Sequence, residues 1–140
     1  MQDRYAAMVK GQISPGMRRL GFTGTAGRYE LASPSHWLLV GLQKSSGSSP
    51  LGVKFTVNVC AISFTDWMRM SARQPRLGAR PSAYYLYDPP ARSARIGQLM
   101  GGDDHWWRLD PATDPAAIAA EVLDAVSTFA VPWLHQHARR

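Results

Sequence analysis

Cysteine is almost absent from this sequence, because Cys60 is the single cysteine among 140 residues. One cysteine excludes a disulfide within the chain, and its scarcity is typical of a reducing compartment. Long apolar runs are also absent, and none approaches the roughly 20 residues that a membrane-spanning helix needs. The first residues lack the apolar stretch of a signal peptide. We therefore expect a cytoplasmic protein that makes no contact with a membrane.

Glutamate and lysine are scarce as well, with two and three residues. Glu30 and Glu121 are both predicted to face water, so paired carboxylates for glycoside chemistry are excluded. Arginine supplies the other thirteen positive charges, and the net charge is +6. Six arginines crowd the segment 69–95, namely Arg69, Arg73, Arg76, Arg80, Arg92 and Arg95. This segment is either a solvated basic surface or a contact for phosphates or an acidic protein.

The composition that is present indicates a folded domain. Hydrophobic residues make up 45% of the chain and include five tryptophans, which argues against disorder. A chain of 140 residues has the size of one domain with its own core. We predict a single domain over residues 1–140.

Two strand-like runs, residues 36–44 and 54–64, form the clearest pattern in the chain, and a serine-rich connector joins them. Apolar residues alternate along both runs, which is the period of a strand with one buried face. The buried sets are Leu38, Val40 and Leu42 in the first run and Phe55, Val57, Val59 and Ala61 in the second. After Cys60 both faces become apolar, so either a bulge shifts the register or helices cover both faces there.

Helices are predicted at both ends of the chain. Residues 3–20 carry an apolar stripe with steps of three or four, interrupted by Ser14-Pro15-Gly16, which predicts a kink or a break. Asp114 is a helix N-cap followed by Pro115, and Pro132 is expected to end or kink that helix.

The remaining segments predict shorter elements. Strands are expected at 28–32, 84–87 and 91–99, an extended piece at 105–109, and a short helix before Pro75. The order predicts an α+β fold: an antiparallel sheet of about four to five strands, with an N-terminal and a C-terminal helix packed mainly on one face.

Six short fragments occur in a fixed order along the chain. They are Leu20-Gly21-Phe22, Leu42-Gln43-Lys44-Ser45, residues 54–59, residues 95–99, Trp106-Trp107 and Pro132-Trp133-Leu134. In this order the chain resembles the uncharacterised bacterial domain-of-unknown-function family 4304, from the end of the first helix to Leu134. Cys60 stands where we expect a glycine in that family, and the segment 66–82 is irregular. The resemblance implies one α+β domain and no catalytic residues.

The residues that carry chemistry elsewhere form no convincing set here. Asp103-Asp104-His105 offers metal-ligand types, but adjacent residues rarely converge on one ion, and a turn is expected. His135 and His137 are two residues apart and do not share a helical face. Cys60 lies in an apolar strand, which favours a core residue over a nucleophile. We expect no metal and no cofactor, name no catalytic residue, and favour a protein that is not an enzyme.

The face opposite the aliphatic one carries the candidate binding residues. Three of them, Gln43, Thr56 and Asn58, project from this face. Trp37 joins them at one end, in the same strand as Gln43. Arg95 and Trp106 join them if later strands extend the sheet. Amides, an arginine and aromatic rings are typical of a recognition surface. The alternative is that this face is covered and its amides bond to loop backbone. Trp106 and its neighbour Trp107 point opposite ways if extended, so at least one belongs to the core.

Three functions remain open on this basis. The first is a non-enzymatic protein-interaction domain, of an accessory or immunity-like kind, with a protein partner. The second is nucleic-acid binding through the arginine-rich segment 69–95. The third is a small-ligand binder or enzyme, with a site assembled from Gln43, Asn58, Arg95, Asp104 and His105.

Overall fold

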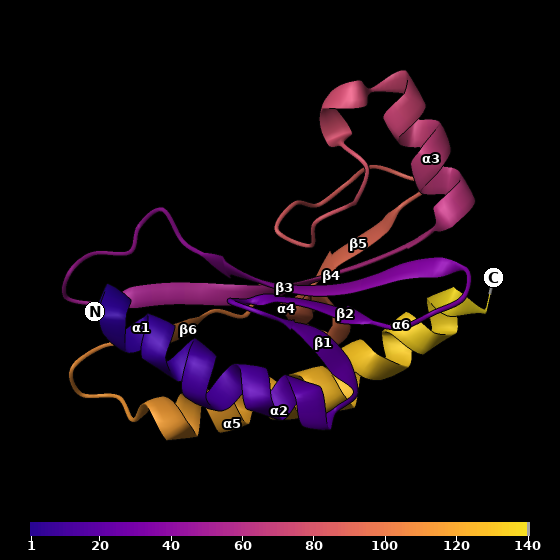
Figure 1. Cartoon of the computed structure of the whole chain (residues 1–140). Helices are drawn as coiled ribbons and strands as arrows, with labels where there is room; N and C mark the ends of the chain where they lie inside the picture. Colours follow the sequence, from indigo (N-terminus) through magenta and orange to yellow (C-terminus); the bar gives the residue numbers. More distant parts are fainter. Residues whose placement is uncertain (140) are drawn as a thin grey trace.

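A six-stranded antiparallel sheet divides the protein into two unequal layers in the computed structural model, which describes residues 1–139 (Figure 1). Four strands follow one another in the order β1-β2-β3-β4, and β5 and β6 both pair with the remaining edge of β4. The bounds are β1 Phe22–Thr25, β2 Arg28–Leu31, β3 His36–Lys44, β4 Val53–Ser63, β5 Arg92–Arg95 and β6 Trp107–Leu109. The predicted α+β fold is confirmed.

The helices are distributed unevenly between the two faces of the sheet. The N-terminal and C-terminal helices lie below it in Figure 1, while α3 and the loop after it stand above one end. The bounds are α1 Gln2–Met8, α2 Ser14–Arg19, α3 Phe64–Arg73, α4 Ile96–Leu99, α5 Pro115–Ala125 and α6 Val131–Ala138. Asp114 caps α5 as expected, because its Oδ1 accepts a hydrogen bond from Ala116 N at 3.0 Å.

The central pair β3–β4 has an unbroken register, from His36↔Ser63 to Lys44↔Phe55. No bulge therefore interrupts it, and the mixed pattern after Cys60 comes from cover on both faces. On the second face Leu39, Cys60 and Ile62 pack against Trp67 of α3 and two loop alanines. The aliphatic sets face the long helices and form the main core, as predicted.

Both long helices contain one π-helical turn that ends two residues before a proline. Val9–Ile13 precedes Pro15, and Val126–Ala130 precedes Pro132. The Ser14 and Val131 amides bond to carbonyls five residues earlier. A proline ring crowds the carbonyl four residues before it, and the wider turn relieves this contact. Of the two predictions at Ser14-Pro15-Gly16, a kink or a break, the break is therefore absent, and the C-terminal helix continues past Pro132 to Ala138.

The π turns also explain why the buried residues of these helices recur every four positions. In an α-helix, residues four apart drift by about 40° around the axis, so a stripe of fours leaves the core face. A π turn contains more residues and rotates the stripe back. The buried members are Tyr5, Val9, Ile13 and Met17 in the first helix, and Val122, Val126, Ala130 and Leu134 in the last.

The C-terminal helical stretch, Pro115–Ala138, is 24 residues long and is apolar enough to cross a membrane, by length and composition alone. Core helices of folded domains can have the same length and composition. The four-residue stripe of this helix is buried against the sheet, and 33% of its apolar 18-residue window is buried.

Two of the predicted short elements differ in the structure, and one strand was missed. Strand β1 was not predicted. It joins β2 through Ala26 and Gly27, whose φ angles are 55° and 82°, as a type I′ hairpin turn requires. The prediction of a strand at 84–87 is wrong, because this segment is a loop. Residues 96–99 form α4 and do not continue β5.

Candidate functional site

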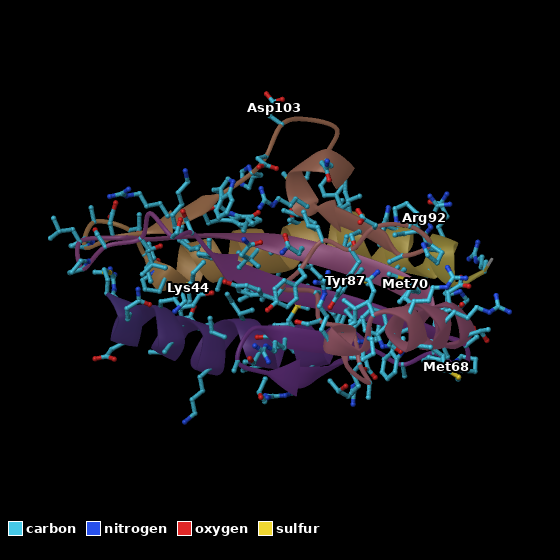
Figure 2. All side chains as sticks on the ribbon, turned by 90° about the horizontal axis from the view of Figure 1, so that it is seen from above. Lys44, Met68, Met70, Tyr87, Arg92 and Asp103 are labelled. Atoms are coloured by element: carbon cyan, nitrogen blue, oxygen red, sulfur yellow. The ribbon has the colours of Figure 1, made fainter. Side chains whose placement is uncertain are left out.

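The chain leaves the edge of β4 after Arg95 and returns to the same edge at Trp107; we call residues 96–106 the excursion. Arg95 N donates to Gln98 Oε1 at 3.0 Å, and Thr56 Oγ1 donates to His105 O at 2.6 Å. The fold is tight at Gly97, where a Cβ would lie 2.2 Å from the Asp103 carbonyl oxygen. Figure 2 shows Asp103 at the tip, pointing away from the sheet.

Asn58 connects three segments of the chain on the face opposite the long helices. Its Nδ2 donates to Gln43 Oε1 at 2.8 Å on β3 and to Tyr84 O at 3.2 Å in the loop after α3. Across the β4–β5 pair, Asn58 lies opposite Arg95. The side chain is fully buried, so its amide holds the loop against the sheet.

Arg95 and Trp106 form the outer layer of the same face. Arg95 NH1 lies 2.8 Å from Asp104 Oδ2, and its guanidinium lies 5.2 Å from the centre of the Trp106 ring. Lys54 Nζ approaches that ring as well, at 5.5 Å. Two cations therefore contact one half-buried indole, and a single carboxylate accompanies them.

The loop after α3 adds an exposed aromatic group that the sequence pattern did not identify. Tyr84, Tyr85 and Leu86 are 43%, 60% and 49% exposed. Ring contacts run from Tyr84 to Tyr85 at 5.4 Å, from Tyr85 to Tyr87 at 6.2 Å, and from Tyr87 to the buried Trp67 at 5.1 Å. The sequence does show this group, as three tyrosines and a leucine at 84–87. Because tyrosines in such a run favour a strand, the pattern predicts a strand there and not an exposed aromatic loop.

The structure brings five of the six predicted binding residues together. Gln43, Arg95 and Trp106 are partly accessible, whereas Thr56 and Asn58 are fully buried and can only position other groups. Trp37 lies apart at the other end of β3. There it packs against Phe64 at 5.1 Å, and the Arg80 guanidinium lies 4.8 Å from its ring. Trp107 is the core member of the tryptophan pair.

Comparison with known proteins assigns the chain to a family. Residues 13–136 match the family described as Domain of unknown function (DUF4304). The chain belongs to this family. No curated protein and no solved structure matches it.

In this DUF4304 domain, the run Arg95–Leu99, one of the six fragments behind the resemblance, forms the end of β5 and the start of the excursion. Arg95 ends β5, Gly97 admits the backbone of the excursion, and the Gln98 side chain caps the helical turn. These residues shape the excursion and bring Trp106 beside Arg95.

Cys60 of this DUF4304 domain is not an activated nucleophile. Its side chain is fully buried, and burial raises the pKa of the thiol to about 11, although a hydrogen bond with Ser93 opposes the shift. The thiol is therefore protonated at neutral pH and packs as a core residue. Within residues 1–139, no group of three His, Cys, Asp or Glu side chains could hold a metal ion.

The arginine-rich segment is divided between separate parts of the fold. Arg69, Arg73 and Arg76 lie on or beside α3, Arg80 reaches Glu30 of β2 at 2.5 Å, and two arginines lie on β5. Arg69 and Arg95 are also paired with carboxylates, at 3.8 Å and 2.8 Å. Three of the six arginines are therefore paired with carboxylates, and Arg73, Arg76 and Arg92 have no ion pair within residues 1–139.

Proposed function

We propose that this DUF4304 domain is a non-enzymatic protein-interaction domain, of an accessory or immunity-like kind, that works in the cytoplasm. It binds its partner through the aromatic surface, which we define as Tyr84, Tyr85, Leu86, Arg95 and Trp106. One observation carries the proposal: Tyr85 and Leu86 are exposed to 60% and 49% on a loop that is anchored to the core.

The anchoring makes this exposure informative. Tyr85 contacts Tyr87, whose hydroxyl accepts a hydrogen bond from Ser82 N at 2.9 Å and whose ring packs on the buried Trp67. Asn58 holds the loop at Tyr84 O. Binding therefore requires little additional ordering of these side chains, which favours affinity. Tyrosine, tryptophan and arginine are also the residues that most often dominate binding energy at interfaces.

The charge around Trp106 indicates the chemistry of the partner. Lys54 and Arg95 flank the indole, the exposed Arg108 follows on β6, and the whole chain carries a net charge of +6. Two of the nearby acids, Asp104 and Asp110, are paired with arginines, and the third, Asp103, points away from the sheet at the tip of the excursion (Figure 2). We infer a partner with acidic residues around an apolar contact, because complementary charge speeds association and selects partners.

The test is photo-crosslinking in cells with a benzophenone amino acid placed at Tyr85. Met68 supplies the matched control position, because it is 68% exposed on α3 and lies outside the aromatic surface. We expect a discrete crosslinked protein from position 85 that is absent from position 68. Its yield should fall at least fivefold when Arg95→Glu and Trp106→Ser are added.

Two results would overturn the proposal. One is the same set of adducts from both positions. The other is an adduct from position 85 whose yield does not change when Arg95 and Trp106 are replaced. The crosslinked protein also tests the inferred chemistry, since a basic contact region on it would contradict an acidic partner.

A further inference from the structure

A cavity of about 870 Å³ lies along the edge of β3, beside the N-terminal helix, and shares only Tyr84 with the aromatic surface. It exists because β2 is shorter than β3. The pairing of these strands ends at Arg28↔Gly41, so Leu42 to Lys44 have no neighbouring strand on that side. Figure 2 shows Lys44 between β3 and the N-terminal helix. We call this space the edge cavity.

Apolar groups form much of the edge cavity. Tyr5, Ala6 and Val9 contribute one side of the N-terminal helix, and Leu42 contributes the strand side. Ala26 and Gly27 of the hairpin turn close one end. Its volume falls within the range of about 300–1,000 Å³ that is typical of small-molecule sites.

The charges that line the edge cavity are four cations and one carboxylate: Lys10, Arg18, Arg28, Lys44 and Asp3. Lys44 lies at the start of the helix near Asp3, where its Nζ donates to Gln2 Oε1 at 3.0 Å. The other three cations lie farther from the start of the helix. Arg18 follows Lys10 by eight residues, about 12 Å along the helix. The NH2 of Arg18 donates at 3.4 Å to Gly24 O, in the hairpin that also carries Arg28.

These three cations are not neutralised by the protein. The ion pairs within residues 1–139 are made by Arg69, Arg80, Arg95 and Arg108. Lys10, Arg18 and Arg28 therefore have no carboxylate partner among these residues. The edge cavity therefore combines apolar walls with three cations that have no carboxylate partner. A ligand with an acid group on an apolar body matches both.

A small molecule fits this edge better than an added peptide strand. Leu42 N donates to Gly27 O, and Ser45 N donates to Lys54 O. Because antiparallel strands alternate their bonding direction, the backbone N–H and C=O of Lys44 face the open edge. One residue with free backbone groups is too short a template for strand addition, which uses a row of main-chain bonds.

We propose that the edge cavity binds a small amphipathic carboxylate. Arg18 and Arg28 hold the acid group, Lys10 adds positive charge farther along the helix, and a short aliphatic or aromatic body lies against Tyr5, Ala6 and Leu42. The site does not depend on the aromatic surface, so it is tested without a protein partner.

The test compares three probes with one aliphatic body: octanoate, octanol and octylammonium. Each is titrated into the ¹⁵N-labelled chain below its aggregation concentration, and amide chemical shifts report both affinity and location. We expect octanoate to bind at least tenfold more tightly than octanol, and octylammonium to bind least. The shifted amides should include Ala6, Gly27 and Leu42.

Variants separate charge from shape. Lys10→Glu with Arg28→Glu should weaken octanoate at least tenfold, and Ala6→Trp should block it by filling the cavity from an exposed helix position. Arg73→Glu with Arg76→Glu makes the same charge change on exposed residues outside the cavity and should leave the affinity within twofold.

Equal affinity for octanol and octanoate would overturn the proposal, as would shifts confined to residues outside the edge cavity. An equal loss of affinity in both double variants would also overturn it, because it would show attraction by net charge alone. Far-ultraviolet circular dichroism and thermal unfolding identify any variant that has lost its fold, and Ala6→Trp then decides the outcome independently of charge.

Discussion

Asn58 and Arg95 face each other across the β4–β5 pair, and each buries a polar atom, Oδ1 and Nε, that has no hydrogen-bond partner within residues 1–139. The other groups of these two side chains are engaged: Nδ2 of Asn58 reaches the loop after α3, and NH1 of Arg95 reaches the excursion. The pair thus joins the two segments that carry the rings of the aromatic surface.

Replacing Asn58 with alanine should release the loop after α3. The variant loses the bonds to Gln43 and Tyr84, and we expect a destabilisation of about 1–3 kcal/mol in urea unfolding. Amide hydrogen exchange should accelerate at residues 82–87. Gln43→Ala is the control, because it keeps the bond to Tyr84 and should cost less than about 1 kcal/mol. Equal losses in the two variants would show that the Tyr84 bond does not stabilise the loop.

The excursion should depend on the absence of a side chain at Gly97. In Gly97→Ala, the Cβ would meet the backbone oxygen of Asp103 at 2.2 Å. We expect a loss of about 2–3 kcal/mol, measured by chemical denaturation, because backbone must move to make room. Gly102→Ala is a matched control in the same segment. Its Cβ meets nothing within 4 Å, and its φ angle is not positive, so its stability should stay near that of the parent chain.

Cys60 should make stability decrease in alkaline solution. The unfolded thiol releases its proton near its ordinary pKa of 9.0, whereas the folded thiol retains it until about 11. Above pH 9 the unfolded state therefore binds fewer protons, and stability declines as the pH rises to 11. As the pH rises from 9 to 11, the unfolding free energy of Cys60→Ala should therefore fall by about 2–3 kcal/mol less than that of the parent chain.

Denaturation at a series of pH values measures this difference. The raised pKa values of Tyr5 and Tyr29, caused by burial, contribute to both proteins and cancel in the comparison. Parallel stability curves for the two proteins would contradict the prediction. At pH 8, iodoacetamide should modify the thiol only after unfolding.

The exposed loop residues should be dispensable for stability, in contrast to the residue that anchors them. Tyr85→Ser should change the unfolding free energy by less than about 0.5 kcal/mol, because position 85 is largely in solvent. Tyr87→Phe removes the acceptor for Ser82 N and should cost about 1 kcal/mol. Thermal and urea unfolding of both variants give the comparison. A larger loss for Tyr85→Ser would assign that side chain a packing role.

The two central strands were predictable because apolar residues alternate along most of the first run and along the second run as far as Cys60. β3 has the predicted bounds, and β4 differs by one residue at each end. The N-cap at Asp114 was predictable for a similar reason, since a local pair of residues determines it. β1 offers no such pattern, because only Phe22 of its four residues is buried. Its position follows from the turn at Ala26 and Gly27, where a non-glycine residue adopts a positive φ angle.

The candidate site was predictable only in composition. Gln43 and Asn58 belong to adjacent strands, so their meeting follows from the pattern. The approach of Arg95 and Trp106 depends on two strands that share one edge of β4, which no local pattern indicates. The strand prediction at 84–87 failed because Tyr87 packs on Trp67, and tyrosine favours strands only where a sheet offers that packing.

The excursion has a practical consequence for labelling this domain. β5 and β6 hold the β4 edge on either side of it, and the tip at Gly101 and Gly102 has open space around both residues. A short epitope or fluorophore-binding tag inserted between these two glycines would lengthen the tip and leave every strand pair in place. The tag would then project beyond the sheet edge, where a microscope or an affinity resin can detect the protein without a fusion at either terminus.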